Sequence, residues 1–231
     1  KREKLGIIKL PGFYDKCSSH CRILLERFNK EKVDGVVLDL RHNGGGILQE
    51  AVNLTGLFIT RGPVVQIKDY RGRQRVMSDV NVNVTYNGPL VVAVSHMSAS
   101  ASEIVAAALQ DHGRAVIVGG KTTHGKGTVQ QLLPLNRSFI ANLAEDSGQL
   151  KFTISKFYRI NGATTQRDGV TADIALPSIM DYLGTSEGEL PRALEADRIA
   201  EAEYKSLDQV SGFFTSLRRA SSKRIKTDQD Y

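Results

Sequence analysis

The chain has 231 residues, of which 41% are hydrophobic, and a net charge of +6. This composition is that of an ordinary globular protein with one large domain, or one domain and an appendage. No apolar run approaches the roughly 18 residues of a membrane-spanning helix, so stable membrane insertion is not expected. The basic residues are dispersed, except for a cluster between Arg218 and Lys226. That distribution favours a solvated tail and argues against a nucleic-acid partner.

Strand and helix patterns alternate over the first 120 residues, and this predicts an α/β fold with crossover connections. Later strands follow one another without helices, so we expect a mixed, largely parallel sheet flanked by helices. A helical, charged extension is predicted from Gly188 onward. The predicted strands are residues 5–10, 35–40, 64–69, 74–78, 89–95, 115–119, 129–135 and 150–158, and the predicted helices are 15–32, 48–59 and 102–111.

The chain opens at Lys1 and enters an apolar strand at once, without a signal peptide. We therefore expect a piece of a longer protein. Its two cysteines, Cys17 and Cys21, share one face of a predicted helix, where a disulfide between them is awkward. With His20 they offer too few ligands for a convincing metal site. Ordinary structural cysteines are the favoured interpretation.

The segment 97–103 (Met-Ser-Ala-Ser-Ala-Ser-Glu) joins a buried strand to a predicted helix. A nucleophile at this place would lie beside unpaired backbone N–H groups that stabilise an oxyanion. A structural reading competes, because Ser100 and Glu103 also fit the capping box Ser-x-x-Glu. Ser98 and Ser102 are equally compatible with solvated hydroxyls.

Two glycine-rich segments are the other candidates for chemistry. Residues 123–130 surround Lys126 with Gly125 and Gly127, but a phosphate-binding loop would need Ser or Thr where Gly127 stands. The alternative frame ending at Lys121 needs a glycine where Ala115 stands, so nucleotide hydrolysis is disfavoured. Residues 39–46 end in three glycines, which suit either a tight turn or a close backbone approach to a ligand.

A Ser–His–Asp triad remains open at this point, because triads assemble in space and not in sequence. No Gly-x-Ser-x-Gly elbow is present. Of the five histidines, His42 and His124 stand in glycine-rich loops and are the ones placed to line a cleft.

Taken together, the motifs resemble the tail-specific, or C-terminal processing, peptidase family. Five segments carry the match in family order over nearly the whole chain, and residues 189–194 resemble the longer tail-specific branch. The resemblance implies a crotonase-like protease core at residues 1–185 and a C-terminal helical extension at 186–231. The five matching segments are residues 6–14, 38–46, 98–104, 125–131 and 166–174.

By position in these motifs, the resemblance implies that Ser100 is the nucleophile and Lys126 its general base. Gln130 would orient the lysine, and the N–H groups of Ala101 and Gly45 would form the oxyanion hole. Asp111 matches an aspartate once grouped with the catalytic set. It stands at the far end of the helix that Ser100 begins, about 15 Å away, so we expect a supporting role.

The sequence departs from the family in one place. Ser100 and Lys126 are 26 positions apart, one more than the usual spacing, with the extra residue in the loop before Gly125. Lys121, in that loop, is a weak rival for the base, since it lacks the Gly-Thr-Val-Gln that follows Lys126.

The implied function is a serine endopeptidase with a Ser–Lys dyad, acting without metal or cofactor on proteins with apolar C-terminal tails. The resemblance further implies a peptide-binding PDZ domain in the full-length protein and a periplasmic or otherwise exported location. Two alternatives stay open, namely a catalytically silent peptide-binding scaffold of the same fold and a Ser–His hydrolase.

Overall fold

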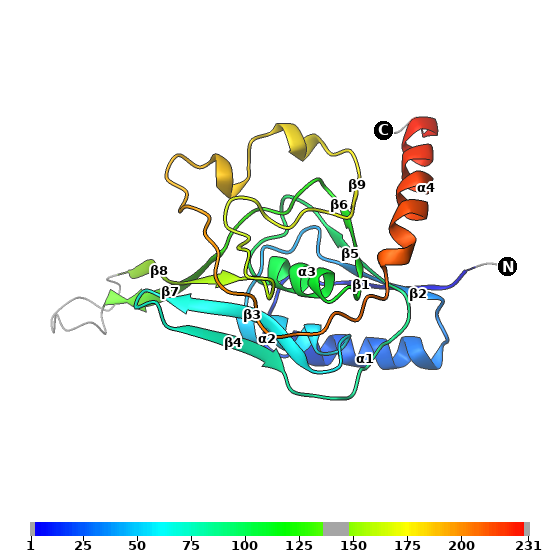
Figure 1. The fold of residues 1–231 in the computed structure, drawn as a ribbon, viewed down its shortest axis with the longest axis horizontal. Helices are drawn as coiled ribbons and strands as arrows, with labels where there is room; N and C mark the ends of the chain where they lie inside the picture. The colour runs from blue at the N-terminus through cyan, green and yellow to red at the C-terminus, as the bar shows by residue number, and fades with distance from the viewer. Residues whose placement is uncertain (1–2, 136–147, 229–231) are drawn as a thin grey trace.

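A computed structural model describes residues 3–135 and 148–228 of the chain. Its centre is a five-stranded sheet in which every pair of neighbouring strands is parallel (Figure 1). The predicted α/β class with a parallel sheet flanked by helices is therefore confirmed. The strand order is β1 (Leu5–Lys9), β2 (Gly35–Asp39), β5 (Leu90–Val94), β6 (Val116–Gly119) and β9 (Ile174–Ala175).

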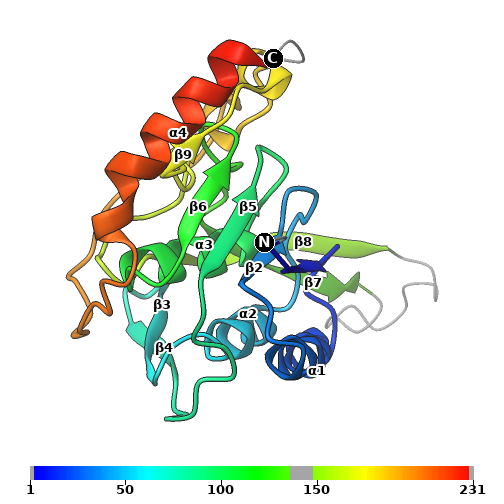
Figure 2. The same cartoon turned by 90° about the vertical axis from the view of Figure 1, so that its right-hand side faces the viewer.

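Three helices line one face of this sheet, as Figure 2 shows: α1 (Cys17–Lys30), α2 (Leu48–Thr55) and α3 (Ala101–Asp111). The hydrophobic core between these layers is continuous. It includes three fully buried side chains of the sheet, Leu38, Val92 and Ile117. Burying this apolar surface is the main force that fixes α3 against the sheet. Helix α3 thereby holds its first residue at the carboxyl edge of the strands, where ligands bind in open α/β sheets.

The remaining strands form a separate antiparallel sheet, so the predicted strands 64–69, 74–78, 129–135 and 150–158 do not join the parallel one. Its order is β4 (Gln74–Asp79), β3 (Gly62–Asp69), β8 (Gln149–Tyr158) and β7 (Thr128–Pro134). Strand β3 contacts α2 and α3, and strand β4 contacts α2. Strand β7 begins two residues after Lys126, and its pairing with β8 shifts register between Val129 and Gln130.

The C-terminal extension is less helical than predicted. Short 3₁₀ turns at Ile179–Tyr182, Glu187–Glu189 and Ser211–Phe213 precede one α-helix, α4 (Phe214–Thr227), which contacts β9 (Figure 2). Residues 193–208 contain no helix, because their backbone bonds to other parts of the chain. Examples are the N–H groups of Ile199, bonded to Gly162, and Leu207, bonded to His112. These tertiary bonds override the helical propensity of a charged sequence.

No helix in the described part of the chain is both long and apolar enough to span a membrane.

Arg114 is a buried cation just after α3 that binds two loops, the one after α2 and the one between β4 and β5. Its side chain is 1% exposed and donates to the carbonyl oxygens of Phe58, Tyr86 and Gly88, each at 2.9 Å. Burial lowers the pKa of the Arg114 guanidinium to about 10. The three carbonyl acceptors offset part of its desolvation.

Replacing Arg114 should therefore destabilise the fold. We expect Arg114→Met to lower the free energy of unfolding by about 3 kcal/mol, because three buried carbonyls lose their donor. Urea denaturation measures the change. The matched control is Arg75→Met on the edge strand β4, where the side chain is exposed and the change should stay within about 0.5 kcal/mol. Equal effects of the two substitutions would contradict the argument.

Candidate active site

Two buried serines fasten the turn between β5 and α3 to the loop that follows β2. The Ser98 hydroxyl accepts from the N–H of Ser95 at 3.0 Å and donates to the carbonyl of Leu40 at 2.7 Å. The Ser102 hydroxyl donates to the carbonyl of Asn43 at 2.7 Å. Both serines are fully buried, so their interpretation as solvated hydroxyls is wrong. Their role is to hold the turn.

Ser100, between them, has a different environment. It is the residue before α3 and has φ 57° and ψ −113°, a backbone conformation that strongly favours glycine. A non-glycine residue held in such a region stores about 1–3 kcal/mol of strain, and strain of this kind concentrates at functional sites. The conformation leaves Ser100 only half-buried, on the wall of a pocket at the N-terminus of α3.

This pocket, of about 270 Å³, brings together several of the predicted site residues. Ser100 and Ala101 line it from the α3 side, and Lys126 and Gln130 line it from the opposite loop and β7. Lys151 of β8 also reaches it. Apolar side chains fill the rest of the wall, namely Leu48, Ile104, Val129, Leu132 and Phe157.

The Lys126 ammonium is half-buried in this wall, and its electrostatic surroundings act in both directions. Burial lowers the pKa of Lys126, and the positive charge of Lys151 lowers it further. The carboxylates of Glu187 and Glu103 raise it, but the net direction is downward. A lysine in this state gives up its proton more readily than one in water, as a general base must.

Glu103 connects the two sides of the pocket. It is fully buried, and one of its carboxylate oxygens accepts from the N–H of Ser100 at 2.8 Å and from that of Lys126 at 3.0 Å. The other oxygen accepts from the Thr123 hydroxyl at 2.6 Å and the Gly125 N–H at 2.8 Å. Burial raises the pKa of Glu103 to about 7, and the four hydrogen bonds oppose that rise.

The capping box predicted for Ser100 and Glu103 therefore describes only half of what Glu103 does. Its carboxylate bonds the backbone of Ser100, as a capping-box glutamate does. The same carboxylate also binds the loop of Lys126, which sequence reasoning missed. The Ser-x-x-Glu pattern was the available signal for this second contact. When the glutamate in the first turn of a helix is buried, its carboxylate needs more hydrogen-bond donors than that turn supplies, so another segment must provide them.

The glycine loop after β2 passes directly behind Ser100. A Cβ on Gly45 would lie 2.9 Å from the Cβ of Ser100, so only glycine fits. The Gly45 N–H donates to the Asn43 side chain at 2.9 Å, while Gly44 and Gly46 line the pocket. The N–H of Ala101, at the start of α3, has no carbonyl one turn earlier to bond within the helix.

The structure separates Asp111 from this pocket. Asp111 lies at the last turn of α3 and binds the guanidinium of Arg159 at 2.5 and 3.1 Å. The amide of Asn161 donates to it as well, at 2.9 Å. These contacts join α3 to the end of β8 and are structural.

The histidines lie outside the lining of the pocket of Ser100. Within residues 3–135 and 148–228, no histidine lines the pocket of Ser100. His124 lies 3.6 Å from Glu187, His96 contacts Asp181 at 2.8 Å, and His42 is exposed. Lys121 is exposed, and it does not line the pocket either. This arrangement favours Lys126 over a histidine as the base for Ser100.

Neither the cysteines nor the acidic residues suggest a metal centre. Cys17 and Cys21 are free and buried, and burial together with a hydrogen bond to Glu50 raises the pKa of the Cys17 thiol to about 12. The described residues hold no group of three His, Cys, Asp or Glu side chains placed to bind an ion.

A serine at a strained strand-to-helix turn, in one pocket with a half-buried lysine, is an arrangement compatible with enzymes that use an activated serine nucleophile. Comparison with known families agrees with that class. Residues 4–176 match the model of peptidase family S41, and residues 180–231 match the C-terminal domain of tail specific protease. The chain belongs to peptidase family S41.

Individual relatives support this assignment. The chain is 42% identical to the tail-specific protease of Haemophilus influenzae over 99% of its own length and 33% of that protein. It is 34% identical to a carboxy-terminal-processing protease of Bartonella bacilliformis over 74% of the chain and 38% of the relative. The chain thus spans about a third of the length of these curated relatives.

Solved structures show the same fold. A photosystem II D1 C-terminal processing protease superposes with a TM-score of 0.64 and 32% identity, covering 74% of this chain and 42% of that one. Mature CPAF superposes with a TM-score of 0.62 over 99% of this chain and 53% of that one. At 13% identity the second likeness concerns the fold alone.

The strain at Ser100 predicts a stability difference between two inactive variants. We expect Ser100→Gly to exceed Ser100→Ala in free energy of unfolding by about 1 kcal/mol, because only glycine tolerates this backbone conformation without penalty. At Ser102, inside the same helix, the order should reverse, with glycine less stable than alanine. Urea denaturation of the four variants tests both signs. The same order at both positions would rule out strain at Ser100.

Glu103 supplies a second prediction. Each carboxylate oxygen of Glu103 accepts two hydrogen bonds. In Glu103→Gln, an amide N–H₂ group replaces one of these oxygens and cannot accept its two hydrogen bonds. We expect the free energy of unfolding to fall by about 2 kcal/mol and peptidase activity to fall with it. Glu26→Gln, on the exposed face of α1, is the control and should change neither. Wild-type activity and stability in Glu103→Gln would contradict the proposed bridge.

Proposed function

We propose that this chain is the catalytic core of a tail-specific serine endopeptidase in which Ser100 is the nucleophile and Lys126 the general base. The observation that supports the proposal is the shared pocket, which Ser100 and Lys126 both line, together with the hydrogen bonds from the backbone N–H groups of both residues to Glu103. Membership of peptidase family S41 supports the same conclusion.

The reaction begins when neutral Lys126 takes the proton of the Ser100 hydroxyl as Ser100 Oγ bonds to the carbonyl carbon of the scissile peptide. For a lysine with an ordinary pKa near 10.4, the neutral form at pH 7 costs about 4–5 kcal/mol. Burial in the wall of the pocket reduces this cost. We assign to Gln130, which lines the same pocket, the role of accepting a hydrogen bond from Lys126.

The tetrahedral intermediate carries a negative oxygen that backbone donors stabilise. We assign one donor to the N–H of Ala101, at the positive end of α3. The second comes from the loop of residues 44–46. Gly45 is the predicted donor, and its N–H must then turn from Asn43 to the substrate; Gly44 and Gly46 already line the pocket. Lys126 returns the proton to the leaving amine, and water then hydrolyses the acyl-enzyme.

The proposal extends to substrates and location. Proteins with apolar C-terminal tails are the proposed substrates, delivered by a PDZ domain of the full-length protein in an exported, periplasmic setting. Such domains bind a peptide as an added strand and capture its terminal carboxylate. The domain boundary near residue 185 is part of this proposal.

The test compares the parent protein with Ser100→Ala and Lys126→Ala on an unfolded protein that has an apolar C-terminus. We expect both substitutions to lower kcat/KM by at least about a thousandfold. We also expect the parent rate to rise with pH through a midpoint below the usual 10.4 of lysine, since burial lowers the pKa of Lys126 and only its neutral form accepts the proton.

Two results would overturn the dyad. If Lys126→Ala still cleaves, the base is another group. Loss of activity in His124→Ala would then identify that base as His124, the histidine two positions before Lys126 in the sequence. If the parent does not react with a fluorophosphonate that labels activated serines, and the full-length protein is equally silent, the scaffold reading holds.

A further inference from the structure

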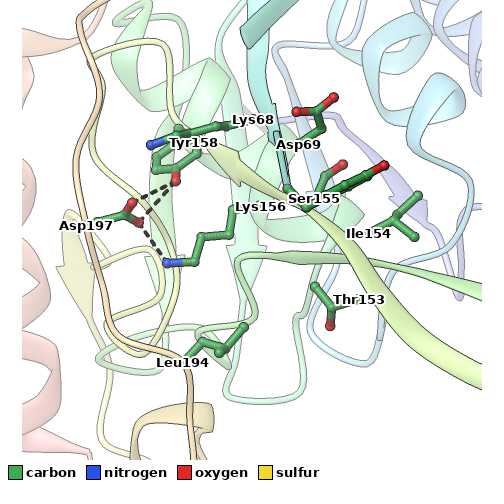
Figure 3. A pocket seen from close by; sticks show the side chains of 10 residues that line it. Lys68, Asp69, Thr153, Ile154, Ser155, Lys156, Tyr158, Leu194 and Asp197 are labelled. Carbon is green, nitrogen blue, oxygen red and sulfur yellow. Dashed lines mark hydrogen bonds and ion pairs between the residues drawn. The ribbon is translucent and has the colours of Figure 1, made fainter. Parts of the chain in front are cut away.

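The segment 178–200 of the C-terminal extension lies across the loops that carry the proposed catalytic residues. At its start, Asp181 binds His96, in the turn that leads to Ser100, at 2.8 Å. Farther along, Asp197 accepts from Lys156 at 3.0 Å and from the Tyr158 hydroxyl at 3.0 and 3.1 Å, as Figure 3 shows. The segment is thus tied at one end to the β5–α3 turn and at the other to β8.

Glu187, between these two anchors, contacts the loop of Lys126 directly. Its backbone N–H donates to the carbonyl of His124 at 2.8 Å, and its carboxylate lies 3.6 Å from the His124 ring. The same carboxylate accepts from the side-chain amide of Gln166 at 3.2 Å. Glu187 therefore contacts His124, which is two residues before Lys126.

Gln166 carries the contact to the other side of Lys126. It is fully buried, and its side-chain oxygen accepts from the N–H of Gly127 at 2.9 Å. Glu187 therefore braces residues 124 and 127, which flank Lys126. Glu103 braces the same loop from α3, through Gly125 and Lys126. The loop of Lys126 is therefore bonded to Glu103 directly and to Glu187 both directly and through Gln166.

We propose that Glu187 is a positioning residue for the peptidase reaction, and that it makes the C-terminal segment part of the catalytic unit. The inference rests on the proposed function of Lys126. Glu187 lies in residues 180–231, outside the region 4–176 that matches the peptidase family model. The peptidase region therefore lacks one support of its own base.

The charge of Glu187 has an effect opposite in sign to that of its hydrogen bonds. A carboxylate near an ammonium favours the charged form, so Glu187 and Glu103 both raise the pKa of Lys126. Lys151, on β8, acts in the opposite direction. Glu187 thus makes deprotonation harder while it keeps the lysine in place, and the two effects are separable by substitution.

The experiment uses the full-length protein and follows kcat, KM and the pH dependence of kcat/KM. In Glu187→Gln the charge is lost but an oxygen remains for Gln166. We expect the pH midpoint to fall by about half to one unit, with kcat at high pH within about twofold of the parent. In Glu187→Ala the midpoint falls likewise, and kcat at high pH falls about tenfold or more while KM changes less than about threefold.

Two further variants fix the interpretation. Lys151→Met should move the midpoint upward, because a positive charge near Lys126 is removed. Glu195→Gln changes an exposed carboxylate in the same segment, paired with Arg167, and should leave the midpoint and kcat at the parent values. Thermal unfolding of each variant shows whether the fold is kept.

Parent values of kcat and of the midpoint in both Glu187 variants would overturn the inference, as would a loss of thermal stability with unchanged kinetics. The isosteric glutamine variant keeps the test decisive if the alanine variant does not fold. Failure of the inference is distinct from failure of the dyad, because Ser100→Ala and Lys126→Ala remain inactive in the first case and active in the second.

Discussion

The arrangement of the pocket depends on one buried carboxylate. Glu103 takes a negative charge out of water, which is costly, and four donors from two separate segments compensate it. Those donors cannot leave without exposing the charge to an apolar surrounding, so the turn of Ser100 and the loop of Lys126 are held at one fixed separation. Two chain segments 26 positions apart thereby behave as one rigid unit.

The scaffold supplies the remaining constraints. Apolar burial fixes α3 between the parallel sheet and strand β3, which sets the direction of its N-terminus. The hydroxyls of Ser98 and Ser102 bind the turn to the carbonyls of Leu40 and Asn43. With the turn held at both ends, Ser100 between them can be kept in a backbone conformation that an unsupported serine would leave.

Much of this organisation could be predicted from the sequence, because it depends on local patterns. Alternating strands and helices predicted the parallel sheet. The family resemblance of the motifs implied Ser100, Ala101, Lys126 and Gln130, which the structure brings to one pocket. The predictions failed where distant contacts decide the outcome. Nothing local distinguishes Ser98 and Ser102 from solvated serines, since their partners lie nearly sixty residues earlier.

In the C-terminal stretch, distant contacts also made the prediction of secondary structure fail. Its charged sequence has helical propensity, yet residues 193–208 contain no helix, because bonds to Gly162, Ile160 and His112 replace the bonds of a helix. In the sequence, Glu103 fits a local capping box and no pattern singles out Glu187. Only the fold places one of them in the interior and the other against the loop of Lys126.

The long-range hydrogen bonds of that stretch also determine the order in which parts of the molecule assemble during synthesis. The amide of Gln66 donates to the carbonyl of Ala200, and the hydroxyl of Ser206 to that of His112, pairs separated by 134 and 94 positions. Contacts of such span form after the chain between them has been made and its loop entropy overcome. Because synthesis runs toward the C-terminus, all the residues that line the pocket are already translated when residues 178–200 are added. The segment that braces Lys126 is thus the last of these parts to emerge, and the pocket gains its final support late in the making of the molecule.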